Sequence, residues 1–249
     1  MLLPGRTDEV TSGTSAKLTP LIACTARHPG ARHIMADTVS TDAVKRKLKF
    51  DYMKIKNEPL SRDIEVLSKL LAHFQRQQIV IRDLIQDAAN QIQSQYRLRW
   101  SMIGLLSESD GMYRYEVHSG MRPDAWHKQR AKVYKYEDFD PNAHNYKAGE
   151  ISRLSRVYLE EENQLVGADQ QVANRPVLLM AKRRTEDETL EADFIDTLIL
   201  GPSDALLGWI EYGGTLSGKF PDPLIIRYIE VISSILAAAI AVHSRSWKR

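Results

Sequence analysis

The chain has 249 residues, of which 43% are hydrophobic, so it can bury the core of one large or two small domains. Its formal net charge of +2 gives no indication of nucleic-acid binding, and Cys24, the single cysteine, excludes an intrachain disulfide or a cysteine-based zinc site. No apolar run approaches the roughly eighteen residues that predict a membrane-spanning helix. We therefore expect a cytoplasmic protein with neither nucleic-acid nor membrane partners.

Residues 1–57 are predicted to form a disordered or irregular N-terminal arm. The segment is rich in Ser, Thr, Gly, Pro and charged residues, and its apolar residues show no sustained period. The sequence leaves open whether Met1 or Met35 is the true start.

A long helix is predicted within residues 58–96, from Ser61 to Gln95, since Pro59 suits a first helical turn and nothing breaks the pattern before Tyr96. Its apolar residues alternate three- and four-residue steps over more than four heptads, which is typical of a coiled-coil seam. A polar side chain in such a seam can fix register and partner number. A homodimer is expected through this seam, and packing on the chain's own sheet is the alternative. The seam residues are Ile64, Leu67, Leu71, Phe74, Gln78, Ile81, Ile85, Ala88 and Ile92.

Two strands, Leu98–Leu106 and Met112–His118, should follow the helix, because the Asp-Gly pair between them favours a hairpin. Period-two alternation places Tyr113, Tyr115 and Val117 on one face of the second strand. Between residues 120 and 190 the chain is polar and irregular, with a short strand predicted at Lys132–Tyr136 and a helix at Ile151–Glu162.

A second hairpin and a final helix are predicted near the C-terminal end. Thr197–Leu200 and Leu206–Tyr212 are β-rich runs separated by a turn-forming cluster. Asp222 can cap the next helix, Pro223 suits its first position, and apolar residues recur at helical spacing over Leu224–Val242.

This order of elements resembles the end of a GAF domain. The likeness is carried by Leu198–Leu200, the run Leu206-Leu207-Gly208-Trp209-Ile210, Pro221–Pro223 and the final helix, with a weaker match at Ile151–Tyr158. The resemblance implies an α+β domain in residues 97–249, with an antiparallel sheet flanked by the long N-terminal and C-terminal helices. It further implies a sensory or dimerising module in which residues 120–190 close over a ligand pocket.

Enzymatic chemistry is not indicated. Gly213–Lys219 fits a phosphate-binding loop, but Phe220 replaces the hydroxyl residue and prolines delay the helix. The histidines have no metal-ligand spacing, no carboxylate stands in a context expected to raise its pKa, and no cofactor is expected. The resemblance adds that the cysteines of methionine-sulfoxide-reducing and bilin-attaching GAF domains are missing here, as is the cyclic-nucleotide pattern.

We therefore predict a non-catalytic sensory or regulatory module that binds an unknown small ligand and dimerises. The alternatives are a structural dimerisation adaptor with a filled pocket, or an enzyme with an unrecognised site. No output segment follows the final helix, so signalling is expected to reach a separate protein. Aromatic walls and cationic groups would suit a small anionic ligand, and the candidate residues are Tyr115, His118, Trp126, Tyr146, Arg153, Arg156 and Tyr158.

Overall fold

The computed structural model describes residues 40–55, 58–76, 79–140 and 146–247, and the chain divides into two compact units, residues 1–49 and 50–249. Helix α1 spans Thr41–Ile55 across that boundary. This part of the predicted irregular arm is therefore helical, because lysine, leucine and arginine are good helix formers and Asp42 lies in the first turn. The rest of the arm, including Cys24 and Met35, lies outside the described residues.

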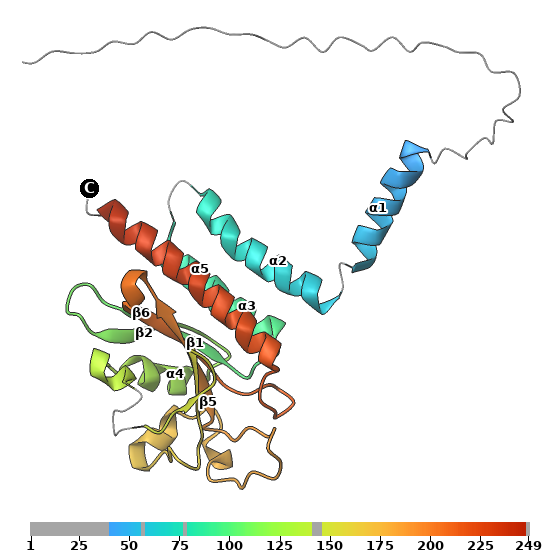
Figure 1. The fold of residues 1–249 in the computed structure, drawn as a ribbon. Coiled ribbons are helices and arrows are strands. Elements are labelled where there is room, and N and C mark those ends of the chain that lie inside the picture. The colour runs from blue at the N-terminus through green and yellow to red at the C-terminus, as the bar shows by residue number, and fades with distance from the viewer. Residues whose placement is uncertain (1–39, 56–57, 77–78, 141–145, 248–249) are drawn as a thin grey trace, which may run out of the picture. The chain divides into compact units, whose positions relative to one another are not determined.

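The second unit is built on a six-stranded sheet in the order β2-β1-β6-β5-β4-β3 (Figure 1). Every neighbouring pair is antiparallel. The two hairpins predicted from the sequence are present, and the sheet with its helices confirms the expected α+β class. The strands are β1 (Ser101–Leu106), β2 (Tyr113–Ser119), β3 (Gly149–Glu150), β4 (Ser155–Tyr158), β5 (Phe194–Leu200) and β6 (Leu206–Tyr212).

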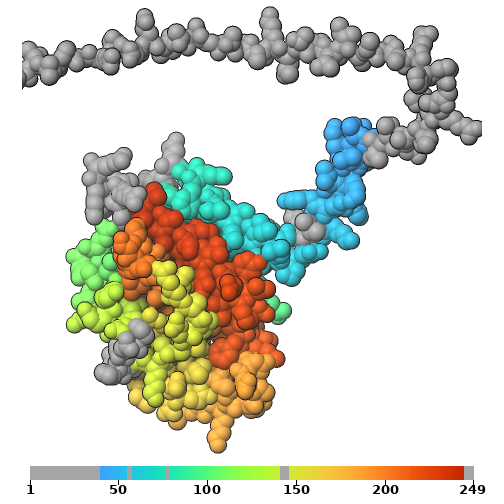
Figure 2. All heavy atoms as spheres, in the orientation of Figure 1, coloured from blue at the N-terminus to red at the C-terminus, as the bar shows by residue number. Residues whose placement is uncertain are grey.

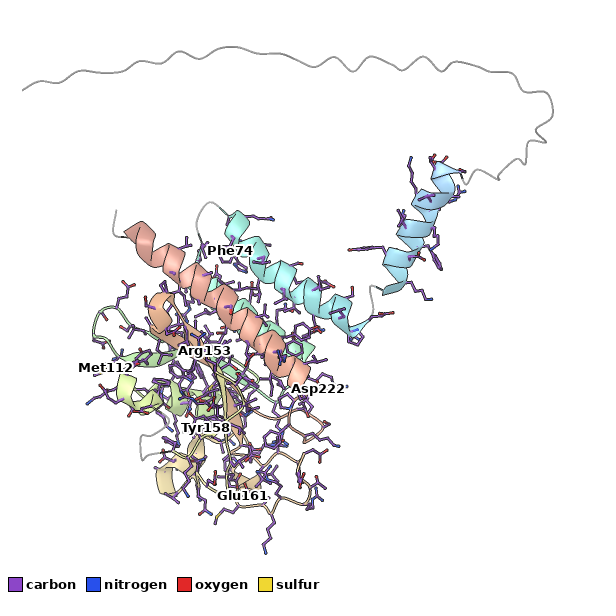
Figure 3. The ribbon with its side chains drawn as sticks, in the orientation of Figure 1. Phe74, Met112, Arg153, Tyr158, Glu161 and Asp222 are labelled. Carbon is purple, nitrogen blue, oxygen red and sulfur yellow. The ribbon has the colours of Figure 1, made fainter. Side chains whose placement is uncertain are left out.

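The final helix, α5, runs from Pro223 to Trp247 and confirms the predicted helix. Asp222 Oδ1 accepts the backbone N–H of Leu224 at 2.8 Å, so the expected cap is present. Figure 3 labels Asp222 at the first turn. A cap of this kind contributes about 1 kcal/mol to helix stability.

One side of α5 is buried and the other is exposed. Ile229, Ile232 and Leu236 are fully buried in the core beneath the sheet. Figure 2 shows α5, in red, uncovered along much of its length on the face in view. By length and apolar composition alone, Pro223–His243 could span a membrane, contrary to the expectation that no segment of the chain is long and apolar enough.

The single helix predicted from Ser61 to Gln95 is wrong, because the segment forms two helices. Helix α2 (Pro59–Leu71) continues into a 3₁₀ turn, η1 (Ala72–Gln75), and α3 starts anew at Ile81 and ends at Gln95. The break lets α3 pack on β1 and β2 while α2 lies beside α3 and α5. Gln78 lies outside the described residues.

The break also divides the predicted seam. Ile85, Ala88 and Ile92 are buried in the chain's own core, so packing on its own sheet is correct for α3. In α2, Ile64 and Leu71 are 55% and 50% exposed. Of the other predicted seam positions, Leu67, Phe74 and Ile81 are half-buried against the same core.

Both faces of the sheet are covered. One face packs on α3 and α5, with α2 beside these two helices, and a second cluster of buried aromatic and apolar side chains lies on the other face. The register shifts between Ile103 and Gly104, so that Val117 and Tyr115 lie opposite these successive residues. This bulge moves Val117 to the helix side and leaves Tyr113 and Tyr115 on the opposite face, which corrects the single face predicted for the three residues.

The segment over the second face contains little regular structure. It holds α4 (Pro123–Arg130) and the short 3₁₀ turns η2 (Tyr136–Phe139), η3 (Gly167–Val172) and η4 (Pro176–Leu178), while η5 (Pro202–Asp204) forms the β5–β6 turn. The strand predicted at Lys132–Tyr136 is reduced to one bridge between Tyr134 and Tyr113.

The helix predicted at Ile151–Glu162 is also wrong, since residues 151–154 form a turn after β3 and the next residues form β4. Ser152 Oγ accepts the backbone N–H groups of Leu154 and Ser155 at 3.1 and 3.0 Å. Such a bond holds the backbone in a turn and competes with helix formation. The Ser152 and Ser155 hydroxyls also donate to Glu230 of α5, which fixes this turn against the helix.

Candidate functional site

A cavity of about 320 Å³ lies on the sheet face that carries the second cluster. Strands β1, β2, β5 and β6 form its base, and α4 with the irregular segment after it forms its sides. The lining includes the aromatic side chains of Trp100, Tyr115, Tyr134, Phe139, Tyr146, Tyr158, Phe194 and Trp209.

Strand alternation aims alternate residues of β5 and β6 at the cavity. On β6, Trp209 and Glu211 share this face, and the intervening Ile210 is fully buried in the helix-side core. Gly104 faces Trp209, and a Cβ at that position would lie 2.2 Å from the indole ring. The absent side chain therefore makes room for the ring.

Two carboxyl groups face each other across the base of the cavity. Asp196 of β5 and Glu211 of β6 are directly opposed in the antiparallel register, and each is 7% exposed. Side chains at such positions have Cβ atoms about 5 Å apart. We call this pair the acid pair.

Tyr115 and Gln129 connect the acid pair to the neighbouring elements. The Tyr115 hydroxyl donates to Glu211 Oε2 at 2.5 Å, and Gln129 Nε2 of α4 donates to the same hydroxyl at 3.1 Å. Burial, and then the charge of Glu211, raise the pKa of Tyr115 well above 10.0, so this hydroxyl keeps its proton. The amide oxygen of Gln129 takes no part in these two hydrogen bonds.

The acid pair is electrostatically unfavourable when both groups are ionised. Burial raises the pKa of Glu211 from 4.5 to about 7, against the Tyr115 hydrogen bond and the charge of Lys132, which lower it. Burial, and then repulsion from Glu211, raise the pKa of Asp196 well above 3.8, opposed by Arg156. The pair therefore retains a proton at pH values where exposed carboxyl groups are ionised.

Two buried acceptor atoms at the cavity have no hydrogen-bond partner. They are Asp196 Oδ1 and the Gln129 amide oxygen, Oε1, in side chains that line the cavity. Buried polar atoms are normally paired, and one that is left unpaired lowers stability by about 1–3 kcal/mol. The two side chains, rather than the unpaired atoms themselves, reach the cavity surface, and a rotation that turns these atoms toward the cavity would let a bound molecule donate to them.

The structure brings together three of the predicted ligand residues, Tyr115, Tyr146 and Tyr158, which line the cavity. The Tyr158 ring stacks on Phe194 with centroids 4.5 Å apart. His118 and Trp126 lie outside the lining and pack on each other, with ring centroids 4.3 Å apart.

The two predicted arginines do not line the cavity either. Arg153 pairs with Asp204 in the β5–β6 turn, and Arg156 donates to the backbone oxygen of Phe139 at 2.6 Å. Arg153 and Tyr158 are both labelled in Figure 3. Neither guanidinium group lines the cavity, although the charge of Arg156 opposes the rise that burial causes in the pKa of Asp196, and the buried charges at the base are acidic.

The acid pair contradicts the expectation that no carboxyl group stands in an apolar context. The signal was present in the runs FIDTLIL and LLGWIEY, each of which places one acidic residue within a buried strand. Whether the two carboxyl groups lie opposite each other depends on the β5–β6 register, which the apolar content of the strands does not reveal. Among the described residues, no group of three or more His, Cys, Asp and Glu could hold a metal ion.

No protein-family model and no curated protein matches this sequence. Solved structures do resemble it. The GAF domain of an Acinetobacter phosphoenolpyruvate-protein phosphotransferase is 10% identical, with a TM-score of 0.48, over 76% of this chain and 96% of that one. The corresponding GAF domain from Coxiella burnetii is 14% identical, with a TM-score of 0.46 and the same coverage.

A phycoerythrobilin-bound GAF domain of a cyanobacterial phytochrome is 13% identical, with a TM-score of 0.47, over 74% of this chain and 97% of that one. The chain is thus similar to GAF domains, as the sequence resemblance indicated. At these identities and TM-scores, ligand and partner have to be inferred from the chain's own residues.

Proposed function

We propose that this chain is a non-catalytic sensory or regulatory module that binds a small molecule in the cavity on the sheet. The observation that carries the proposal is the pair of unpartnered buried acceptors in a cavity of about 320 Å³. Ligand pockets are typically about 300–1,000 Å³, apolar, with a few converging polar groups. A purely structural adaptor would be expected to fill this space with side chains.

An enzyme is the second candidate, and the pKa of Glu211 is the observation that favours it. A carboxyl group with a pKa of about 7 is suited to general acid–base catalysis. Native mass spectrometry separates the two candidates, because a sensor should retain its ligand unchanged, whereas an enzyme should convert it over time.

We predict that the full chain, purified from its own source, carries a small molecule that is visible by native mass spectrometry. Replacing Ala192, which lines the cavity, by Phe should abolish this mass increment because the added ring occupies the space. Ala205→Phe is the matched control, since Ala205 is exposed in the β5–β6 turn. Equal retention by both variants would place the ligand elsewhere, and an empty wild-type protein that binds no added compound would favour the adaptor.

Dimerisation is part of the proposed function, with a second copy of the chain as the partner. Exposed apolar side chains lie on α2 and α5, two helices that pack side by side. They include Leu60 (60% exposed), Ile64 (55%), Leu71 (50%), Leu224 (62%) and Val231 (44%). This surface replaces the continuous seam predicted from the sequence. A dimer that changes on ligand binding would carry the signal to a separate protein.

We predict a dimer at micromolar concentration, measured by light scattering. Ile64→Asp combined with Leu71→Asp should give a monomer, because burying two carboxylates at an apolar interface is costly. Leu216→Asp is the control, since Leu216 is 61% exposed in the loop before α5. A wild-type monomer would refute this part of the proposal and leave ligand binding untouched.

A further inference from the structure

We propose that the cavity selects a compact organic cation, whose ammonium group lies at the acid pair and whose carbon atoms contact the aromatic walls. The inference rests on the proposed function, since it assigns a ligand class to the same cavity.

The unpaired atoms indicate a ligand that donates hydrogen bonds. Asp196 and Gln129 are each 7% exposed, and the atom left without a partner is an amide oxygen in Gln129 and, in Asp196, a carboxyl oxygen that is an acceptor when the group is ionised. The orientation of Gln129 follows from its neighbour, because the Tyr115 hydroxyl donates to Glu211 and must accept an N–H from the amide. An ammonium group has three N–H donors and no acceptor, so it can bind to these oxygens. A carboxylate or phosphate group has only acceptor oxygens when ionised and cannot donate to them.

The charges at the cavity also favour a cationic ligand. Its described lining contains five carboxyl side chains, those of Asp138, Asp140, Glu191, Asp196 and Glu211, and one basic side chain, that of Lys132. Some of these charges are already balanced, since Arg175 pairs with Glu191 at 2.7 Å and Lys132 lies 3.6 Å from Asp169. Arg156, outside the lining, partly offsets the charge of Asp196. The acid pair combines two carboxyl groups with the Tyr115 hydroxyl, so a cation between them would relieve their repulsion.

The walls suit an organic cation. Indole and phenol rings attract ammonium groups through the negative faces of their π systems, and apolar carbon fills the rest of such a site. The Trp209 and Tyr115 rings lie beside the acid pair with centroids 4.8 Å apart but are almost fully buried. Tyr146 and Tyr158 supply the more accessible aromatic surface of the lining. A divalent metal ion is a poorer fit, since no set of three or more ligating side chains is present among the described residues.

Calorimetric titration of the full chain at pH 8 tests this inference with probes that differ in charge. The cations are benzylammonium, butylammonium and tetramethylammonium. Benzyl alcohol and benzoate match the first in shape, and Mg²⁺ is the metal probe. We expect benzylammonium or butylammonium to bind at millimolar concentration or below, and tetramethylammonium, which has no N–H group to donate, to bind more weakly. Binding should weaken about thirtyfold or more in Asp196→Asn and in Glu211→Gln, the loss expected when one side of a buried charge pair is removed.

Glu150→Gln is the control variant, because Glu150 is an exposed residue of β3 and should leave affinity unchanged. Thermal unfolding of all variants shows whether the fold is intact. If no ammonium probe binds, or if the two acid-pair variants bind it as well as the wild type, the inference is refuted. Benzoate or benzyl alcohol that binds the wild type but not Ala192→Phe would refute the cation and leave the proposed small-molecule site standing.

Discussion

Replacing Glu211 by Gln should raise the free energy of unfolding at pH 8 by about 3 kcal/mol and should have little effect near pH 4. Burial raises the pKa of Glu211 from 4.5 to about 7 in the folded protein. Each pKa unit corresponds to about 1.4 kcal/mol. Glutamine has no proton to lose and can still accept the Tyr115 hydroxyl through its amide oxygen, so the variant retains that contact.

The sign follows from proton binding. Between about pH 4.5 and 7 the unfolded chain has lost the Glu211 proton while the folded chain still holds it, so stability falls as pH rises through this window. Below the window both states are protonated, and above it the loss is complete. The groups around Glu211 are Tyr115 of β2, Asp196 of β5 and Lys132 after α4.

Urea unfolding of the wild type and Glu211→Gln at pH values from 4 to 8 measures this difference. The gap between the two curves should open between about pH 4.5 and 7, whereas Glu150→Gln, at an exposed position, should follow the wild type throughout. A Glu211→Gln protein that is less stable than the wild type at pH 8 would show that the carboxylate is a favourable structural charge.

A stabilising substitution inside the core would have a functional meaning. A sequence optimised for stability alone would place apolar or neutral side chains in this cavity. Charged side chains that lower stability there are therefore typical of residues retained for binding. Asp196 and Glu211 lie in largely apolar strands and are buried like the apolar residues beside them. The stability effect and the loss of cation affinity should therefore appear in the same variants.

Sequence alone predicted the elements whose signals are local. The β5–β6 hairpin was predicted from β-rich runs and turn residues, and α5 from its apolar spacing and the cap at Asp222. The hairpin, the helix and the cap are all present. The helix break after Gln75 has no such signal, since no Gly or Pro marks it and the apolar spacing continues. The position of the break depends on the packing of α3 against β1 and β2, which involves contacts between residues distant in sequence.

The candidate site was predictable only in part, for the same reason. Tyr115, Tyr146 and Tyr158 could be proposed from the aromatic content of the region that covers the sheet. The acid pair requires knowledge of which residues oppose each other across β5 and β6. A one-residue slip of that register would turn one carboxyl group to the opposite face.

Asp193, three residues before Asp196, is a buried carboxylate whose replacement should lower stability, in contrast to Glu211. Replacing Asp193 by Ala should lower the free energy of unfolding by about 3–5 kcal/mol, the range for removing one member of a buried ion pair. Its side chain is fully buried and accepts the backbone N–H groups of Glu160 and Leu190 at 2.8 and 2.7 Å. Arg183 lies 3.0 Å from its Oδ2 atom.

The loss should be large because two backbone N–H groups lose the acceptor that Asp193 provides and Arg183 loses one of its two carboxylate partners. Two backbone donors and a guanidinium group would remain in a region that water reaches poorly, since the Arg183 side chain is 16% exposed. Arg183 keeps Glu161 as a partner, at 2.8 Å, and the Phe220 ring, which limits the damage to the part of the network around Asp193.

Denaturant unfolding at pH 8 compares Asp193→Ala, just before β5, with Asp196→Asn, within β5. The first should destabilise the protein by several kcal/mol, whereas the second should leave it as stable as the wild type or more so, because it removes an unfavourable charge. Similar losses in both variants would mean that Asp196 is as well satisfied as Asp193. The acid pair would then be a structural feature, and the cavity would have no unbalanced charge with which to attract a cation.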